Sequence, residues 1–94
     1  MNKDIFFSVI IPTFNRFKKI KVAINSVINQ TYQNWELIII DNKSSDNTKE
    51  LVKSYNNKKI SFYEIDNKGI IAKSRNFGIE KSFGEYLCFL DSDD

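Results

Sequence analysis

The stretch that decides the fold is Trp35-Glu36-Leu37-Ile38-Ile39-Ile40-Asp41-Asn42. Its apolar run is short and rich in β-branched residues, which is typical of a strand buried on both faces of a parallel sheet. Two further runs have the same character: Phe6-Phe7-Ser8-Val9-Ile10-Ile11, which we expect Pro12 to end, and Tyr86-Leu87-Cys88-Phe89-Leu90. The run Ile60-Ser61-Phe62-Tyr63-Glu64-Ile65 alternates and predicts a strand nearer an edge of the sheet.

Segments with helical periodicity separate these runs. In the second segment, Asn47 is a candidate N-cap and Glu50 follows it at the spacing of a capping box. The third segment runs from Ala72 to Phe83, and Gly84 then fits a helix stop. In the first segment, residues spaced by three or four positions form one apolar stripe: Phe17, Ile20, Ile24, Val27 and Ile28.

The alternation of strands and helices predicts the α/β fold class. We expect a Rossmann-like parallel sheet with flanking helices, in a single domain over residues 1–94. The favoured strand order is 3-2-1-4, and ligands of such sheets bind beyond the carboxyl ends of the strands. Suggestive polar groups follow every one of these ends: Pro12-Thr13-Phe14-Asn15-Arg16, Asp41-Asn42-Lys43-Ser44, Asp66-Asn67-Lys68-Gly69 and Asp91-Ser92-Asp93-Asp94.

Composition narrows the possible functions. The net charge of +2 is too weak to indicate nucleic-acid binding. No apolar run reaches the length of a membrane span, and Met1-Asn2-Lys3-Asp4 is no signal segment, so we expect a cytoplasmic protein. Cys88 lies inside an apolar run and is expected to be a buried, inert thiol. Because the chain has no histidine, its chemistry depends on carboxylates, amides, lysines or a bound ion.

The acidic run after the fourth strand predicts a metal site. Asp91 and Asp93 can share one Mg²⁺ or Mn²⁺ and leave its other positions to substrate phosphates. A polar turn that closes the strand is the simpler alternative. Glycine-rich phosphate-binding motifs are absent from the sequence, so a diphosphate would be held by the cation, with help from Lys73 and Arg75. A role as ordinary surface charges is the alternative for these two residues.

Amides and carboxylates near the first two strand ends suit a nucleobase. Asp41 and Asn42 match the donor and acceptor groups of uracil or a similar ring, although both residue types also commonly cap turns. Thr13 and Asn15 leave the same two alternatives open. Phe14 can pack on a ring or on the core.

Five motifs follow one another along the chain with little insertion: Val9–Arg16, Ser26–Tyr32, Glu36–Thr48, Ser74–Gly78 and Gly84–Asp94. Together they resemble the nucleotide-binding half of a family 2 glycosyltransferase with the GT-A fold. The resemblance covers essentially the whole chain and implies an inverting enzyme, in which an acceptor hydroxyl attacks and a nucleoside diphosphate leaves.

This resemblance implies roles for individual residues. Asp91-Ser92-Asp93 is similar to the family's Asp-x-Asp motif, which implies Asp93 as the main ligand of a divalent cation (Mn²⁺ or Mg²⁺) and Asp91 as its helper. The implied donor is a nucleotide-sugar, most simply a UDP-sugar. Residues implied to contact it are Pro12, Thr13, Phe14, Asn15, Arg16, Asp41, Asn42, Gly69, Lys73, Arg75, Asp91 and Ser92.

The chain departs from the family's pattern at two places. Asp41-Asn42-Lys43-Ser44 stands where the family often has Asp-Asp-Gly-Ser, which leaves the preferred base open. The family's general base would follow residue 94, so we assign no catalytic base and expect no sugar transfer by this chain alone. An open fourth strand would favour a homodimer. The main alternative is a non-catalytic nucleotide-binding or interaction module, and a phosphotransferase is disfavoured because its acidic pair normally ends the first strand.

Overall fold

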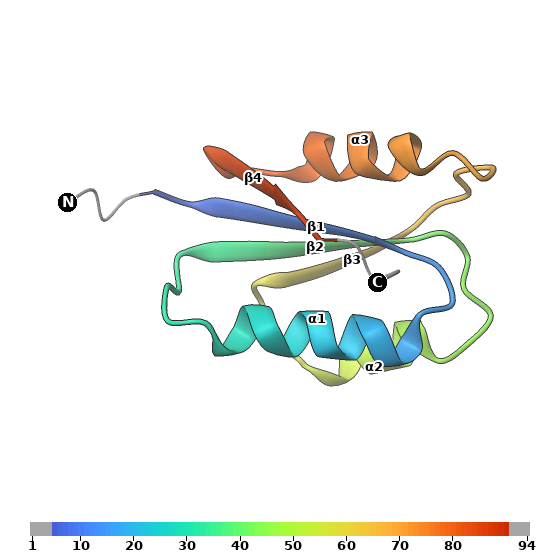
Figure 1. The fold of residues 1–94 in the computed structure, drawn as a ribbon, viewed down its shortest axis with the longest axis horizontal. Coiled ribbons are helices and arrows are strands. Elements are labelled where there is room, and N and C mark those ends of the chain that lie inside the picture. The colour runs from blue at the N-terminus through green and yellow to red at the C-terminus, as the bar shows by residue number, and fades with distance from the viewer. Residues whose placement is uncertain (1–4, 91–94) are drawn as a thin grey trace.

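The computed structural model describes residues 5–90. Within them, strands and helices alternate along the chain as the sequence predicts (Figure 1). The elements are β1 (Phe7–Thr13), α1 (Phe17–Asn29), β2 (Trp35–Asp41), α2 (Thr48–Ser54), β3 (Ile60–Glu64), α3 (Ile71–Lys81) and β4 (Tyr86–Phe89).

The four strands form a parallel sheet in the order β3-β2-β1-β4, which confirms the predicted order. β1 pairs with β2 on one side, with Phe7 opposite Trp35. On its other side β1 pairs with β4, with Phe7 opposite Tyr86. The winding of the chain reverses between β1 and β4, and open α/β sheets bind their ligands at such a switch point.

Helices cover both faces of the sheet, with α1 and α2 on one face and α3 on the other (Figure 1). Because strand side chains alternate between the faces, each apolar strand supplies both cores. On the α3 face, Ile10, Ile38 and Ile40 form a buried cluster against Phe77. The larger cluster on the α1 face comprises Val9, Ile11, Ile20, Ile24, Val27, Trp35, Leu37, Ile39 and Val52.

The prediction that Pro12 ends the first strand is wrong, because β1 continues through Thr13. Alternate residues of β1 bond to opposite neighbours: the Ile10 carbonyl accepts the N–H of Leu90, whereas the Thr13 carbonyl accepts that of Asn42. The nitrogen of Pro12 therefore faces the β4 side, past the paired part of β4, which ends opposite Ile10. No hydrogen bond to β2 is lost there, so the sheet tolerates proline at this position.

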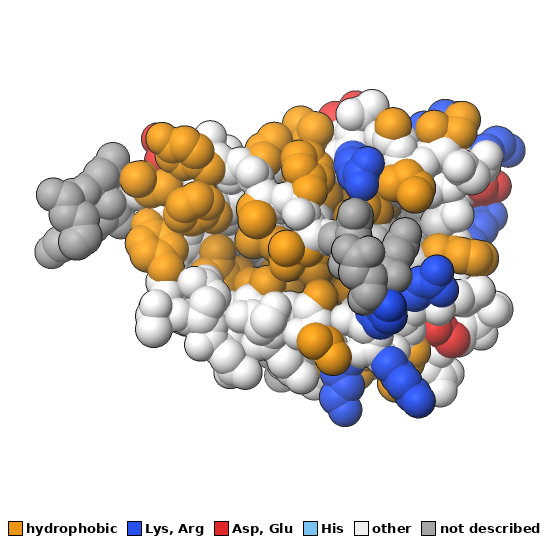
Figure 2. Space-filling view, viewed as in Figure 1, with side chains coloured by type: hydrophobic (Ala, Val, Ile, Leu, Met, Phe, Trp, Pro, Cys, Tyr) orange, Lys and Arg blue, Asp and Glu red, His pale blue; other side chains and the backbone are white. Residues whose placement is uncertain are grey.

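β4 is not the buried strand that the sequence predicts. All its residues are exposed, and Cys88 is an exposed thiol. The reason is position: β4 lies at an edge of the described sheet, whereas α3 packs on β1 and β2. The expected homodimer stays a prediction. Figure 2 shows apolar side chains gathered over this part of the molecule, where an apolar groove of about 660 Å³ is lined by Ile5, Phe7, Val9, Ser26, Val27, Gln30, Tyr32, Trp35, Cys88 and Leu90.

The predicted cap of α2 also differs. Asn47 occupies the N-cap position but makes no hydrogen bond to the helix through its side chain. Instead, Asp46 Oδ1 accepts the Thr48 N–H at 3.1 Å, and Asp46 Oδ2 accepts the Phe17 N–H at 3.2 Å. One carboxylate therefore caps the starts of both α2 and α1, and it joins the loops that precede them.

Gly84 does not end α3, whose last residue is Lys81. It allows the turn before β4 to approach the first strand, where the Gly84 N–H donates to Ser8 Oγ at 2.7 Å. Ser8 Oγ donates in turn to Glu36 Oε2 at 2.6 Å, and the Phe83 N–H donates to the same oxygen at 2.7 Å. These bonds fix the α3–β4 turn against β1 and β2.

Candidate functional site

A cavity of about 280 Å³ lies at the carboxyl edge of the sheet. Its walls come from the end of β1, from the loops that follow β1, β2 and β3, and from the first residue of α3. It therefore lies where sheets of this type bind ligands. The lining residues are Pro12, Thr13, Phe14, Arg16, Asn42, Asn67, Gly69 and Ile71.

Hydrogen bonds between the loops after β1 and β2 hold one side of this cavity. The Asn15 N–H donates to Ser44 Oγ at 2.8 Å, and the Ser45 N–H donates to Asn15 Oδ1 at 2.8 Å. Asn15 has a φ of 49°, in the left-handed region that asparagine adopts more readily than most residues. Asn15 thus braces the two loops and does not line the cavity.

Asp41 ends β2 and is only 2% exposed. Its carboxylate accepts both the hydroxyl and the N–H of Ser44, the latter at 2.9 Å. Burial raises the pKa of Asp41, while these two hydrogen bonds from Ser44 act to lower it. Asp41 therefore positions Ser44, and through it Asn15, from behind the cavity wall.

The raised pKa of Asp41 predicts a pH dependence of stability. A carboxyl group whose pKa is higher in the folded than in the unfolded chain adds stability as the pH falls through its folded pKa. Asp41→Asn removes this titration. We therefore expect the free energy of unfolding of the wild type to rise, relative to that of the variant, as the pH falls from about 7 to about 4. Urea unfolding of both proteins across this range measures the difference, and parallel profiles would contradict the prediction.

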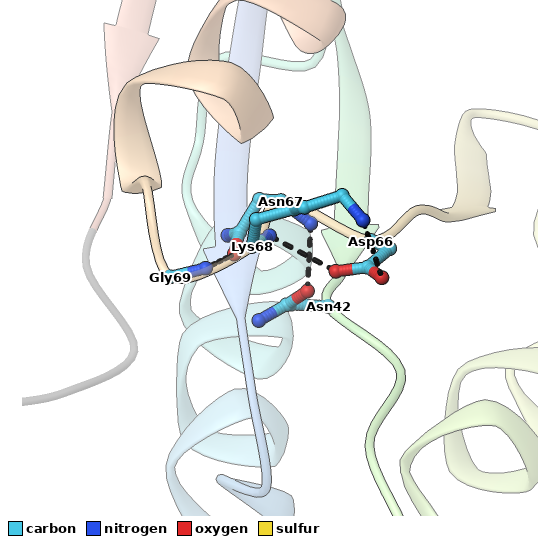
Figure 3. A network of polar contacts seen from close by, with 5 residues as sticks. All are labelled: Asn42, Asp66, Asn67, Lys68 and Gly69. Carbon is cyan, nitrogen blue, oxygen red and sulfur yellow. Dashed lines mark hydrogen bonds and ion pairs between the residues drawn. The ribbon is translucent and has the colours of Figure 1, made fainter.

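The amide of Asn42 has a fixed orientation. Its Oδ1 accepts the backbone N–H of Asn67 at 2.9 Å (Figure 3). Asn67 is 5% exposed; its Nδ2 donates to Ser74 Oγ at 3.0 Å, and its Oδ1 accepts the Gly69 N–H at 2.8 Å. Because a backbone N–H requires an acceptor, Asn42 directs its oxygen to Asn67 and its Nδ2 elsewhere.

The turn between β3 and α3 carries charge at the rim of the cavity. Asp66 accepts the Lys68 N–H at 2.9 Å, and the Lys68 ammonium lies 3.9 Å from the same carboxylate (Figure 3). The backbone hydrogen bond holds the pKa of Asp66 below its usual range, and the positive charges of Lys68, Lys43 and Lys73 add to this effect. With Arg16 in the cavity wall, this edge of the sheet suits an anionic ligand.

The structure brings part of the predicted site together. Asp41 is buried behind the cavity wall, Asn15 lies in an exposed loop outside the lining, and Lys73 and Arg75 lie on α3, also outside it. Asp91, Ser92 and Asp93 lie outside the described residues. The predicted residues that line the cavity are Pro12, Thr13, Phe14, Arg16, Asn42 and Gly69.

Two lining residues, Asn67 and Ile71, are absent from the predicted set. The sequence places Asn67 in the polar segment after the third strand, and its distance of two residues from Gly69 is the signal that could have identified it. Ile71 carries no such signal, because an apolar residue at the start of a helix is ordinary.

The residues that the sequence predicts as ligands of Mg²⁺ or Mn²⁺, Asp91 and Asp93, lie outside the described residues. Within residues 5–90, no group of three or more Cys, Asp or Glu residues could hold a metal ion. Asp41 is already engaged by Ser44. The Leu90 N–H donates to the Ile10 carbonyl at 3.0 Å, and β4, which is parallel to β1, runs toward the carboxyl edge of the sheet. The carboxylates of Asp91 and Asp93 are the hard oxygen ligands that such ions prefer.

Comparison with known proteins identifies the family. The family model named glycosyl transferase family 2 matches residues 8–94. The chain belongs to this family. The amylovoran biosynthesis glycosyltransferase AmsB of Erwinia amylovora is 42% identical to it over 98% of the chain. WfgD of Escherichia coli, named as a UDP-Glc:alpha-D-GlcNAc-diphosphoundecaprenol beta-1,3-glucosyltransferase, is 37% identical over 97% of the chain.

Solved structures of other proteins share the fold. A structure of Staphylococcus aureus TarS in complex with UDP-GlcNAc superposes with a TM-score of 0.87 at 34% identity, and the match covers 95% of this chain and 27% of that one. The mannosyltransferase PcManGT of Pyrobaculum calidifontis, in complex with GDP-Man and Mn²⁺, matches in fold with a TM-score of 0.83 at 22% identity, over 93% of this chain and 27% of that one. These matches confirm the predicted GT-A fold for this family 2 glycosyltransferase chain.

The family 2 chain spans only part of its relatives, 32% of AmsB and 36% of WfgD. The activities of those whole proteins are therefore not assigned to this chain by the match alone. Among residues 5–90, every helix is too short or too polar to cross a membrane.

Proposed function

We propose that this chain forms the donor-binding part of a glycosyltransferase, and that its cavity holds the nucleoside of a UDP-sugar. The position and lining of the cavity carry the proposal: it lies at the carboxyl edge of the sheet and combines Phe14 and Ile71 with the amides of Asn42 and Asn67. A uracil ring has apolar faces and a polar edge, and it matches such a lining. The binding of UDP-GlcNAc by TarS, which shares this fold, supports the same ligand class.

The diphosphate of the donor would be held by charge. Asp91 and Asp93 are the residues that we propose to hold Mn²⁺ or Mg²⁺, which neutralises phosphate oxygens when bound. Arg16 lines the cavity, and the positive charges of Lys68, Lys43 and Lys73 act on this edge of the sheet. These groups favour a dianionic or trianionic ligand over a neutral nucleoside.

The proposed reaction is an inverting transfer. The acceptor hydroxyl oxygen forms a bond to the anomeric carbon of the donor sugar, the bond from that carbon to the diphosphate oxygen breaks, and UDP leaves with the electron pair. The proton of the hydroxyl passes to a carboxylate base. Neither Asp41 nor Glu36 suits this role, because Ser44 engages the first, and Ser8 and Phe83 engage the second. The names of AmsB and WfgD support an acceptor in polysaccharide biosynthesis.

We expect Phe14→Ala to weaken UDP binding about tenfold, since stacking of a base on an aromatic ring contributes roughly 1–3 kcal/mol. Phe14 lines the cavity and is 50% exposed, so its ring is available to a ligand and its removal disturbs the core little. Titration of the ¹⁵N-labelled chain with UDP, followed by NMR, measures the affinity and identifies the amides that shift.

Phe83→Ala is the matched control. Phe83 is 86% exposed and lies in the turn before β4, outside the cavity lining. The proposal fails if the wild type shows no saturable shifts at the residues of the cavity, or if both variants bind UDP as the wild type does.

A further inference from the structure

The orientation of the Asn42 side chain determines which chemical group the cavity offers to a nucleobase. This inference rests on the proposed function. Asn42 lines the cavity, and its backbone N–H is bound to the Thr13 carbonyl at 2.9 Å. Its side-chain oxygen is bound to the Asn67 N–H. Figure 3 shows its Nδ2 directed away from that bond, to the side on which Gly69 lies. A ligand in the cavity therefore meets a hydrogen-bond donor at this position.

The anchor that fixes this amide is itself buried. Asn67 and Ser74 are 5% and 1% exposed, and they are joined by a hydrogen bond of 3.0 Å. Rotation of the Asn42 amide by half a turn would set its Nδ2 against the Asn67 N–H, so that two donors would face each other. The structure thus holds Asn42 in one orientation, with an NH₂ group turned to the ligand.

The two common pyrimidines differ in what they show to such a group. Uracil carries an N3–H donor between two carbonyl acceptors, whereas cytosine carries N3 and O2 as acceptors beside an amino donor. An NH₂ donor finds an acceptor on either base. A carboxylate in its place would accept the N3–H of uracil but would oppose the N3 lone pair of cytosine.

We propose that Asn42 reads the pyrimidine through its Nδ2 donor, and that the site therefore accepts uracil and cytosine nucleotides with similar affinity. Asn42 is then a specificity-determining residue. The substitution Asn42→Asp tests it directly because the two side chains have nearly the same shape. One carboxylate oxygen of the variant can still accept the Asn67 N–H, and the other replaces the donor by an acceptor.

The experiment titrates the wild type, Asn42→Asp and Asn29→Asp with UDP and with CDP. In the wild type we expect the two dissociation constants to agree within about threefold. In Asn42→Asp we expect the preference for UDP over CDP to rise about tenfold or more, because a buried acceptor left without a donor weakens CDP binding. The ratio of the two constants isolates the base, because both nucleotides carry the same diphosphate.

Asn29→Asp is the matched control, since it adds the same charge at the last residue of α1, which is exposed and at the opposite end of the helix from the cavity. Its UDP-to-CDP ratio should equal that of the wild type. A wild type that prefers UDP tenfold, or an Asn42→Asp ratio that does not change, would overturn the inference while the proposed function stands. Failure of both nucleotides to bind the wild type would overturn both.

Discussion

Replacing Asp93 by alanine is expected to abolish the effect of Mn²⁺ on UDP binding. A divalent ion of this size is usually held by one or two carboxylates together with substrate phosphates, so neither ligand set binds it tightly alone. The affinities for metal and UDP are then coupled reciprocally, and we expect Mn²⁺ to raise UDP affinity by about 5-fold to 150-fold, the usual range of such couplings. Asp93→Ala should lose this gain and keep the metal-free affinity of the wild type.

Calorimetric titration with UDP, with and without Mn²⁺, measures this coupling. Asp94→Ala is the matched control, since it removes an adjacent carboxylate to which we assign no ligand role. The prediction would be contradicted if Mn²⁺ left the UDP affinity of the wild type unchanged. It would also be contradicted if Asp93→Ala and Asp94→Ala lost the same share of the gain in UDP affinity that Mn²⁺ causes. A retained Mn²⁺ effect in Asp93→Ala would assign the cation to other oxygens of the acidic run.

Gly84→Ala should cause the largest loss of stability among the substitutions considered. A Cβ at this position would lie 2.6 Å from the backbone nitrogen of Ser8 and 2.9 Å from the carbonyl oxygen of Phe6. Backbone atoms cannot rotate away from the added Cβ, so the turn before β4 has to move away from β1 to relieve the clash. This movement weakens the pairing of Phe7 with Tyr86. We expect a loss of about 2–3 kcal/mol, the upper part of the usual range for overpacking, and a fall in melting temperature of roughly 10–20 °C.

The other two glycines provide graded controls. At Gly78 an added Cβ would meet Ile10 Cγ2 at 2.6 Å and Ile40 Cδ1 at 2.9 Å. These are side-chain atoms that can shift, and alanine favours the helix by about 1 kcal/mol, so Gly78→Ala should cost less. At Gly69 the space is open and only the φ of 80° opposes a side chain. Thermal unfolding should rank Gly84→Ala as the least stable of the three, and any other ranking would refute the argument from backbone contact.

The sequence predicts the sheet well because strands that are buried in it consist mainly of apolar residues, and such runs are visible in the sequence. Continuous apolar runs such as Leu37–Ile40 are typical of strands that are covered on both faces, and the alternation with helices leaves few topologies to consider. The same reasoning fails for β4. Its apolar run is as clear as that of β2, but its position at the edge leaves Cys88 exposed. An apolar run shows that a strand has side chains suited to burial. Whether they are buried depends on the strands and helices that pack beside it.

The candidate site is predicted less completely, because its details depend on hydrogen bonds between distant loops. Asp41 and Asn42 are equivalent by type and position in the sequence, yet the structure places Asp41 behind the wall and Asn42 in it. Likewise Asp46 caps two helices, although Asn47 has the better sequence signal for one of them. Local patterns identify which strand ends contribute to the site, but they do not separate a residue that braces a loop from one that meets the ligand.

The pairing of β1 with β4 determines when this edge of the sheet can form. Phe7 lies opposite Tyr86, so the strand made first and the last of the described strands are neighbours. Parallel strands cannot be joined by a tight turn, and contacts between residues so far apart in the chain form slowly. During translation, β1 can pair with β2 on one side well before β4 leaves the ribosome. Its other side stays open until then, so a chaperone that shields an unpaired strand would be needed most during this interval.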